Sequence, residues 1–152
     1  MSDQTATARV PPDDLITAEQ TAGRYAMLDM LIPPGGGPPP DRHDFEEQFH
    51  LLDGEIELTF RGEKVTVRAG QTVNVPARAP HHFANAADRT ARIVSPPGLE
   101  QYFADFGEEL PSRTSAATVL GEQELAARIA AAAPLAARFG IENLLPETGE
   151  GR

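Results

Sequence analysis

The sequence contains no cysteine and no tryptophan, and only 6% of its residues are aromatic. Without cysteine there are no disulfide bonds, and no zinc site can be built on thiolate ligands. No apolar run is long enough to cross a bilayer. The first ten residues, MSDQTATARV, lack the apolar segment of a signal peptide. These absences favour a cytoplasmic protein.

Basic residues are also scarce, with 13 Lys and Arg against 23 Asp and Glu, so that the net charge is −10. A surface this acidic repels the phosphates of nucleic acids and the head groups of anionic membranes. We therefore expect neither a nucleic acid nor a membrane as a partner. Small organic molecules, metal cations and other proteins remain.

The length of 152 residues suits one domain. Short runs of alternating apolar and polar residues fill most of residues 16–95 and predict an all-β fold, with spacing typical of a barrel or a sandwich. Asp53-Gly54 lies between two such runs and predicts a hairpin. Residues 1–13 are polar and predict a mobile N-terminal arm. The predicted strands are residues 25–32, 47–52, 55–60, 64–68, 72–75, 81–85 and 92–95.

After residue 95 the period changes from that of strands to that of helices. A first helix is predicted from Pro97 to Gly107. A second, Ala-rich helix is predicted over residues 122–139, with Leu125, Ile129 and Ala133 on one face. Pro134 is expected to interrupt it, and Gly140 is placed to cap its C-terminus. The predicted organisation is an arm (1–13), a β-barrel (14–97) and a C-terminal helical extension and tail (98–152).

Two histidines and a carboxylate fall where the predicted strands bring them together. In the strand at 47–52, alternation places Glu47 on the face of Phe49, so its carboxylate is expected inside and needs a partner. In the strand at 81–85, His81 shares a face with Phe83. If the strands close into a barrel, His43, Glu47 and His81 converge within it. Two imidazoles and one carboxylate suit Fe(II), Mn(II) or Zn(II) and leave positions open for a substrate.

The same stretches resemble the two motifs of the cupin superfamily of small β-barrels. The first, G(x)5HxH(x)3–4E(x)6G, is matched by Gly37, Asp41, His43, Glu47 and Gly54, with Asp41 in place of the first His and three residues in place of five between Gly37 and Asp41. The second, G(x)5PxG(x)2H(x)3N, is matched by Gly70, Pro76, His81 and Asn85, with Arg78 in place of the middle Gly. The resemblance covers residues 24–97. It implies a double-stranded β-helix (jelly-roll) barrel in which His43, Glu47 and His81 bind a metal.

Asp41 is the departure from the cupin pattern, and two interpretations stay open. Either its carboxylate binds a divalent ion (Fe, Mn, Ni or Zn) in place of the usual His, or it lies at the mouth of the barrel. If it binds, two carboxylates cancel the charge of the ion and the site is formally neutral. A neutral site is a weaker Lewis acid than a site of three His and one Glu, and attracts anions less.

Other polar residues near these motifs have simpler expected roles. His50 and His82 are expected to face away from the interior, because each follows an inward-facing residue in its strand. Asn85 is expected to support the second motif by hydrogen bonds. Arg42 and Arg78 are expected to be solvated, with an anionic substrate near the mouth as the alternative.

The resemblance to cupins implies a metal-dependent oxidoreductase that acts on a small organic molecule. Its leading form is dioxygenase chemistry on a phenolic or enol substrate, as in quercetinase-like cupins, with Glu47 as both ligand and proton acceptor. A non-redox isomerase or lyase and a non-catalytic small-molecule binding module are the alternatives, because one fold hosts all three. A homodimer is also expected, since small cupins often pair through their sheets.

Overall fold

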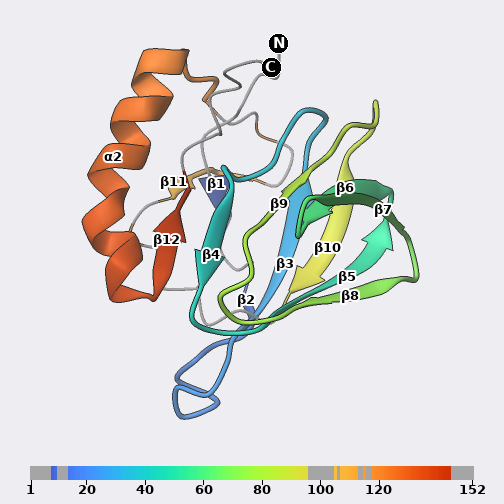
Figure 1. Cartoon of the computed structure of the whole chain (residues 1–152), viewed down its shortest axis with the longest axis horizontal. Coiled ribbons are helices and arrows are strands. Elements are labelled where there is room, and N and C mark those ends of the chain that lie inside the picture. Colours follow the sequence, from blue (N-terminus) through green and yellow to red (C-terminus); the bar gives the residue numbers. More distant parts are fainter. Residues whose placement is uncertain are drawn as a thin grey trace.

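The computed structural model describes residues 8–9, 14–95, 105, 107–112, 115 and 118–144. Two five-stranded antiparallel sheets face each other (Figure 1). The first sheet has the order β2 (Asp14–Ile16), β3 (Met27–Ile32), β10 (Ala91–Ser95), β5 (Glu47–Asp53) and β8 (Thr72–Val75). The second has the order β12 (Ile141–Asn143), β4 (Asp41–His43), β9 (His81–Ala84), β6 (Glu55–Phe60) and β7 (Glu63–Arg68). A separate parallel pair joins β1 (Ala8–Arg9) to β11 (Glu108–Glu109).

The predicted all-β fold is therefore confirmed as a two-sheet sandwich of the jelly-roll kind. Alternation along β5 buries Glu47, Phe49 and Leu51 and leaves Gln48 and Leu52 exposed, as predicted. The inward-facing side chains of both sheets form one apolar core, since burial of apolar surface drives their packing. Its fully or nearly fully buried members are Phe49, Leu51, Ile56, Leu58, Val67, Val75, Phe83, Ala91 and Ile93, with Phe60 partly buried against them.

The hairpin predicted at Asp53-Gly54 is wrong, because β5 and β6 belong to different sheets. The dipeptide is instead the corner where the chain crosses between the sheets. Gly54 has a positive φ of 74°, and a Cβ there would lie 2.9 Å from the Cα of Ala91. The hairpin between β6 and β7 turns at Arg61-Gly62, where both residues have positive φ, as a tight two-residue turn requires.

The C-terminal helix α2 (Glu122–Arg138) confirms the second predicted helix with two corrections. The helix runs through Pro134, whose ring is exposed, because packing of Ala132 and Ala136 holds the turns around it. Ala133 is exposed, so the packed face is carried by Ala132 and Ala136. Gly140 follows the helix with φ 71°, as expected of a C-terminal cap.

The helix packs beside β12, which is the edge strand next to β4, so the C-terminal segment extends the second sheet (Figure 1). The helix predicted between Pro97 and Gly107 lies almost wholly outside the described residues, and so does the arm at 1–13 apart from β1. No helix in the described ranges is long and apolar enough to span a membrane. The homodimer and the cytoplasmic location stay predictions.

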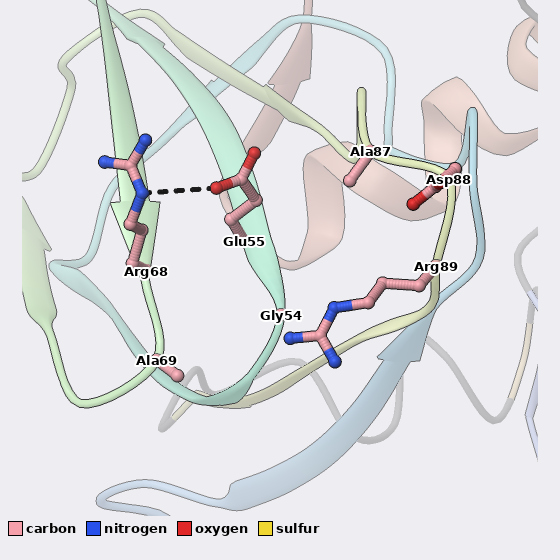
Figure 2. Close-up of a pocket in the computed structure, with 7 residues that line it drawn as sticks. All are labelled: Gly54, Glu55, Arg68, Ala69, Ala87, Asp88 and Arg89. Carbon is pink, nitrogen blue, oxygen red and sulfur yellow. Dashed lines mark ion pairs between the residues drawn. The ribbon is translucent and has the colours of Figure 1, made fainter.

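A surface depression of about 400 Å³ lies at the end of the sandwich where β5 finishes (Figure 2). Its walls come from the corner after β5, the end of β7 and the loop between β9 and β10. The lining residues are Gly54, Glu55, Arg68, Ala69, Ala87, Asp88 and Arg89. None of them is a residue that the sequence motifs single out for chemistry, apart from the corner glycine.

Candidate metal centre

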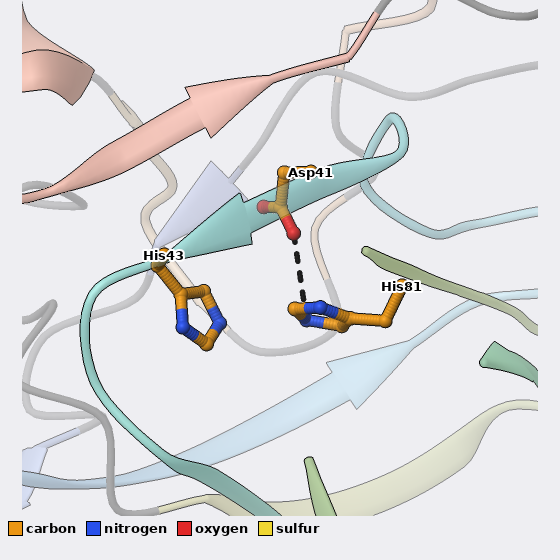
Figure 3. A group of neighbouring side chains, drawn as sticks. All are labelled: Asp41, His43 and His81. Atoms are coloured by element: carbon orange, nitrogen blue, oxygen red, sulfur yellow. Dashed lines mark ion pairs between the residues drawn. The ribbon is translucent and has the colours of Figure 1, made fainter. Parts of the chain in front are cut away.

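The four residues predicted as ligands meet at the opposite end of the sandwich, where β5 begins. Asp41 and His43 alternate on β4, and His81 begins β9, where it is the register partner of Asp41. Glu47 comes from the other sheet and closes the group from across the core. Figure 3 shows the side chains of Asp41, His43 and His81 turned toward one another. Their ligand atoms all lie within 4.8 Å of one another.

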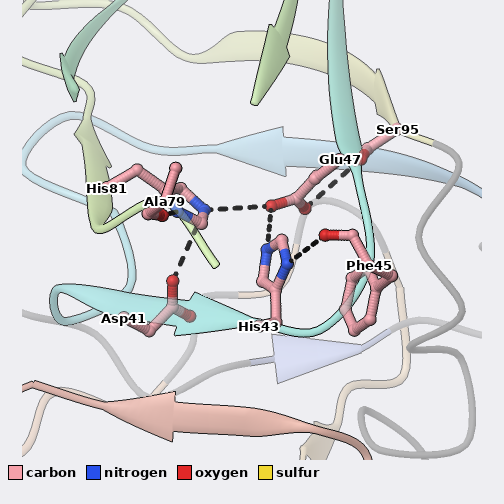
Figure 4. Close-up of polar contacts among 7 residues, drawn as sticks. All are labelled: Asp41, His43, Phe45, Glu47, Ala79, His81 and Ser95. Atoms are coloured by element: carbon pink, nitrogen blue, oxygen red, sulfur yellow. Dashed lines mark hydrogen bonds and ion pairs between the residues drawn. The ribbon is translucent and has the colours of Figure 1, made fainter. Parts of the chain in front are cut away.

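Glu47 links the two imidazoles. Its Oε2 lies 3.0 Å from His43 Nε2 and 3.2 Å from His81 Nε2, and His81 Nε2 lies 3.4 Å from Asp41 Oδ1 (Figure 4). Donors that share one metal ion at about 2.1 Å are separated by roughly 3.0–3.4 Å in octahedral or tetrahedral geometry. These three separations therefore fit donors that share a divalent ion.

Both imidazoles are oriented by backbone carbonyls. His43 Nδ1 donates to the Phe45 carbonyl at 2.8 Å, and His81 Nδ1 donates to the Ala79 carbonyl at 3.0 Å. A carbonyl only accepts a hydrogen bond, so each ring carries its proton on Nδ1 and donates it to that carbonyl. Nε2 then faces the carboxylates. Metal-binding histidines are held in this way in most metalloproteins. The ring of Phe45 also stacks on that of His43, with centroids 4.0 Å apart.

The side chains of the candidate centre offer more hydrogen-bond acceptors than donors to one another. A neutral imidazole with its proton on Nδ1 presents a lone pair at Nε2, and an ionised carboxylate also only accepts. Each contact between Nε2 and a carboxylate oxygen therefore requires either an extra proton or a cation between the two atoms. His43, His81 and Glu47 are buried, so water cannot easily resolve the conflict. This donor chemistry fits a bound divalent ion.

The pKa directions follow from the same contacts. Burial raises the pKa of Asp41 to about 6, and the charge of Glu47 adds to the shift while the histidines oppose it. Burial alone would also raise the pKa of Glu47, but its hydrogen bonds with His43 and His81 outweigh burial and lower it. Burial would lower the pKa of His81, yet its bonds to Glu47 and Ala79 raise it. The carboxylate of Glu47 is thus held ionised, whereas that of Asp41 beside it resists ionisation.

The supporting residues match the expectations in most respects. His50 faces outward and contacts Thr72 Oγ1 at 2.8 Å, and His82 is likewise on the outer face, paired with Thr59. Asn85 is completely buried, and its amide donates to the Ile32 and Arg89 carbonyls. It therefore ties the end of β3 to the loop between β9 and β10.

Arg42 and Arg78 lie at the surface in ion pairs. Arg42 binds Glu142 through two nitrogens at 2.8 and 2.9 Å, and Arg78 binds Asp44 at 2.7 Å. Arg78 has a positive φ of 66°, which explains why the cupin motif has glycine there. Its backbone N–H donates to the His43 carbonyl at 2.7 Å, so this strained residue fixes the end of the strand that carries His43.

Sequence reasoning missed three contributors to the centre: the carbonyls of Phe45 and Ala79, and Ser95. Ser95 is completely buried at the end of β10, and its Oγ donates to Glu47 Oε1 at 3.4 Å. The alternation of β10 was a signal for its inward orientation, since Ser95 shares a face with Ile93. The two carbonyls had no signal, because a backbone contact does not depend on residue type.

With this geometry established, the sequence was compared with known proteins. Residues 28–96 match the cupin domain family. This segment belongs to the cupin superfamily. The matched segment contains all four residues of the candidate centre and ends just after Ser95. A crystal structure of a predicted oxalate decarboxylase from Thermotoga maritima shares the cupin fold, with a TM-score of 0.52, 21% identity, and coverage of 55% of this chain and 74% of that one.

Several curated proteins are similar to this cupin over part of their length. Quercetin 2,3-dioxygenase of Bacillus subtilis is 40% identical over 52 residues, which cover 34% of this chain and 15% of that enzyme. Polyketide synthase CurC of Streptomyces cyaneus is 30% identical over 80 residues, or 52% of this chain and 51% of that protein. The transcriptional regulator PuuR of Escherichia coli is 37% identical over 54 residues, which cover 36% of this chain and 29% of that protein. The chain thus spans about half or less of the length of each of these relatives.

Proposed function

We propose that this cupin binds a divalent metal ion through His43, His81, Glu47 and Asp41 and acts on a small phenolic or enol molecule, with dioxygenase chemistry as the leading form. One observation carries the proposal. The Nε2 atoms of two buried histidines, whose Nδ1 protons are already donated to carbonyls, both face the same carboxylate oxygen of Glu47. Two imidazoles and a carboxylate with further positions open are the usual ligand set of non-haem Fe(II) oxygenases.

Each residue has a defined task in this proposal. The carbonyls of Phe45 and Ala79 orient the two imidazoles, and Ser95 holds the second oxygen of Glu47. Glu47 is assigned as a ligand and as the acceptor of a proton from the substrate hydroxyl, and its lowered pKa keeps it ionised. Asp41 is assigned as the fourth ligand. When bound, the metal supplies Lewis acidity that favours ionised phenol or enol oxygens and, for a redox-active ion, reactivity toward dioxygen.

A second candidate is a non-redox isomerase or lyase. A site with two carboxylates is formally neutral with a divalent ion, and polarisation of a carbonyl or enediol needs no change of oxidation state. The match to the regulator PuuR favours the third candidate, a binding module without turnover.

The test begins with elemental analysis of protein purified without chelator, followed by incubation with phenolic substrates, quercetin among them, with and without dioxygen. We expect close to one divalent ion per chain and conversion that consumes oxygen. Conversion that is unchanged under anaerobic conditions would favour the isomerase or lyase. Saturable binding without conversion would favour the binding module. Failure to retain any divalent ion, even after reconstitution, would contradict the proposal as a whole.

A further inference from the structure

A single row of side chains crosses the second sheet at the metal centre. Asn143 on β12 pairs with Asp41 on β4, Asp41 pairs with His81 on β9, and His81 pairs with Phe60 on β6. Directly paired residues of antiparallel strands place their side chains on the same face of the sheet. Asn143 therefore shares the inner face with Asp41 and His81, although it lies far outside residues 28–96, which match the cupin family.

The hydrogen bonds around this pair bring the two side chains close together. The Asp44 N–H donates to the Gly140 carbonyl at 2.9 Å, and the Leu144 N–H donates to the Pro40 carbonyl at 2.8 Å. This alternation makes Asp41 and Asn143 a non-hydrogen-bonded pair, in which side chains approach most closely, with Cβ atoms about 4.5–5.5 Å apart.

The neighbour of Asn143 gives an independent check on its direction. Glu142 pairs with Arg42 in the register of β12 and β4, and the two side chains form a two-nitrogen ion pair at the surface. Successive residues of a strand point to opposite faces. Since Glu142 points outward, Asn143 points toward the metal centre.

Asn143 stands outside the proposed ligand set and next to it. It lies one strand from Asp41 and two strands from His81, at a strand spacing of about 4.8 Å. Its side-chain amide is therefore placed to reach an atom of a molecule held at the centre. In the described part of the chain the Asn143 amide makes no hydrogen bond, so both its donor N–H groups are available.

Exposure indicates the direction from which such a molecule approaches. The side chains of His43, His81 and Glu47 are 1%, 3% and 10% exposed, whereas that of Asp41 is 19% exposed. Asn143 stands next to Asp41 on the side away from His81 and is half-buried. A molecule that reaches the centre past Asp41 therefore passes the amide of Asn143.

We propose that Asn143 donates a hydrogen bond to an oxygen of the phenolic or enol ligand, so that the C-terminal strand β12 supplies a specificity-determining residue of the site. The inference rests on the proposed function. A hydrogen bond from a neutral amide to an ionised oxygen is among the stronger ones, and its loss from a partly buried site is expected to weaken binding about ten-fold or more.

The test uses full-length protein loaded with Zn²⁺, which avoids redox turnover, and 4-nitrocatechol as the probe, followed by its absorption change on binding. The variants are Asn143→Ala, which removes the amide, and Asn143→Asp, which keeps its shape but loses the donor. Glu142→Gln is the matched control on the outer face of the same strand. Zinc affinity is measured in parallel for every variant.

We expect both Asn143 variants to bind 4-nitrocatechol about ten-fold or more weakly, with the control close to wild type and Asn143→Ala within about three-fold of wild type in zinc affinity. Probe affinity equal to wild type in Asn143→Ala, or equal loss in Glu142→Gln, would overturn this inference and leave the proposed function standing. Failure of zinc-loaded wild-type protein to bind the probe would contradict the phenolic ligand class, and with it both proposals.

Discussion

The two ends of strand β5 carry similar residue types in opposite states. At its start, Glu47 is buried and shared between two buried histidines. At its end, roughly 20 Å away at about 3.3 Å per residue, the chain turns into the depression of Figure 2, where Arg68 binds Glu55 at 3.2 Å. Arg89, which also lines the depression, binds Asp53 beside it at 3.1 Å. These four side chains are between 43% and 64% exposed.

The difference shows why burial of charge, and not a surface depression, marks the start of β5 as the candidate site. Exposed ion pairs cost little and contribute little, because water solvates both partners in either state. Buried carboxylates and imidazoles are expensive unless each is satisfied, and such groups concentrate at functional sites. The depression offers open space lined by exposed ion pairs, whereas the candidate centre at the start of β5 gathers buried groups that a metal ion would satisfy.

The largest expected effect comes from removing one imidazole of the centre. His81→Ala deletes an Nε2 that faces both Glu47 and Asp41, so we expect metal affinity to fall by more than about 100-fold. The stabilisation gained on adding metal should fall with it, since that gain follows the ratio of metal concentration to Kd. Calorimetric titration and thermal unfolding with and without Mn²⁺ or Zn²⁺ measure the two effects.

His82→Ala is the matched control, because His82 is the next residue on the same strand and points to the outer face. Its metal affinity should stay within about three-fold of wild type. Equal losses in the two variants would mean that the register of β9 relative to the centre is wrong.

An intermediate effect is expected for Asp41→Asn, which keeps the shape of the side chain and removes its charge. Burial raises the pKa of Asp41 from its ordinary value of 3.8 to about 6 in the folded chain. Between these two pH values the folded state holds the proton more tightly than the unfolded state, so the contribution of this group to stability falls as the pH rises. Metal-free Asp41→Asn should therefore be more stable than wild type at pH 8, by about 1–3 kcal/mol, and no more stable near pH 4.

The same variant should bind metal about ten-fold or more weakly at pH 8. Wild-type affinity should decline as the pH falls through about 6, where Asp41 takes up its proton, and the variant should lack this part of the decline. Denaturant unfolding and metal titration across this pH range provide the measurements. Identical affinity and pH dependence in the two proteins would leave a three-ligand site of His43, Glu47 and His81.

The smallest effect is expected at the opposite end. Glu55→Gln removes the charge that pairs with Arg68, and because both side chains are exposed the free energy of unfolding should change by less than about 1 kcal/mol. Metal affinity should stay within about two-fold of wild type, since the pair lies at the far end of β5. A larger loss of metal binding would show that the two ends are coupled, and the contrast between them would no longer hold.

Most strands and all four residues of the centre could be predicted from the sequence. Alternation is a local property, so the burial of Glu47, Phe49 and Leu51 could be inferred from their spacing in one strand. The short strands β4 and β12 gave too little periodicity to be recognised as strands. The turn at Asp53-Gly54 was misassigned, because its residues satisfy both a hairpin and a corner between sheets, and only the partners of β5 and β6 distinguish the two.

By itself the sequence determined the alternating β pattern, the absence of thiolate chemistry and the residues that have metal-binding side chains, since these depend on residue type and spacing. The tertiary structure alone decided which groups meet. It brought Glu47 from one sheet to the histidines of the other, committed their Nδ1 protons to the Phe45 and Ala79 carbonyls, and set Asn143 beside Asp41 across 102 positions of chain. Such contacts join residues distant in sequence, and they depend on strand pairing and sheet packing, which no local pattern encodes.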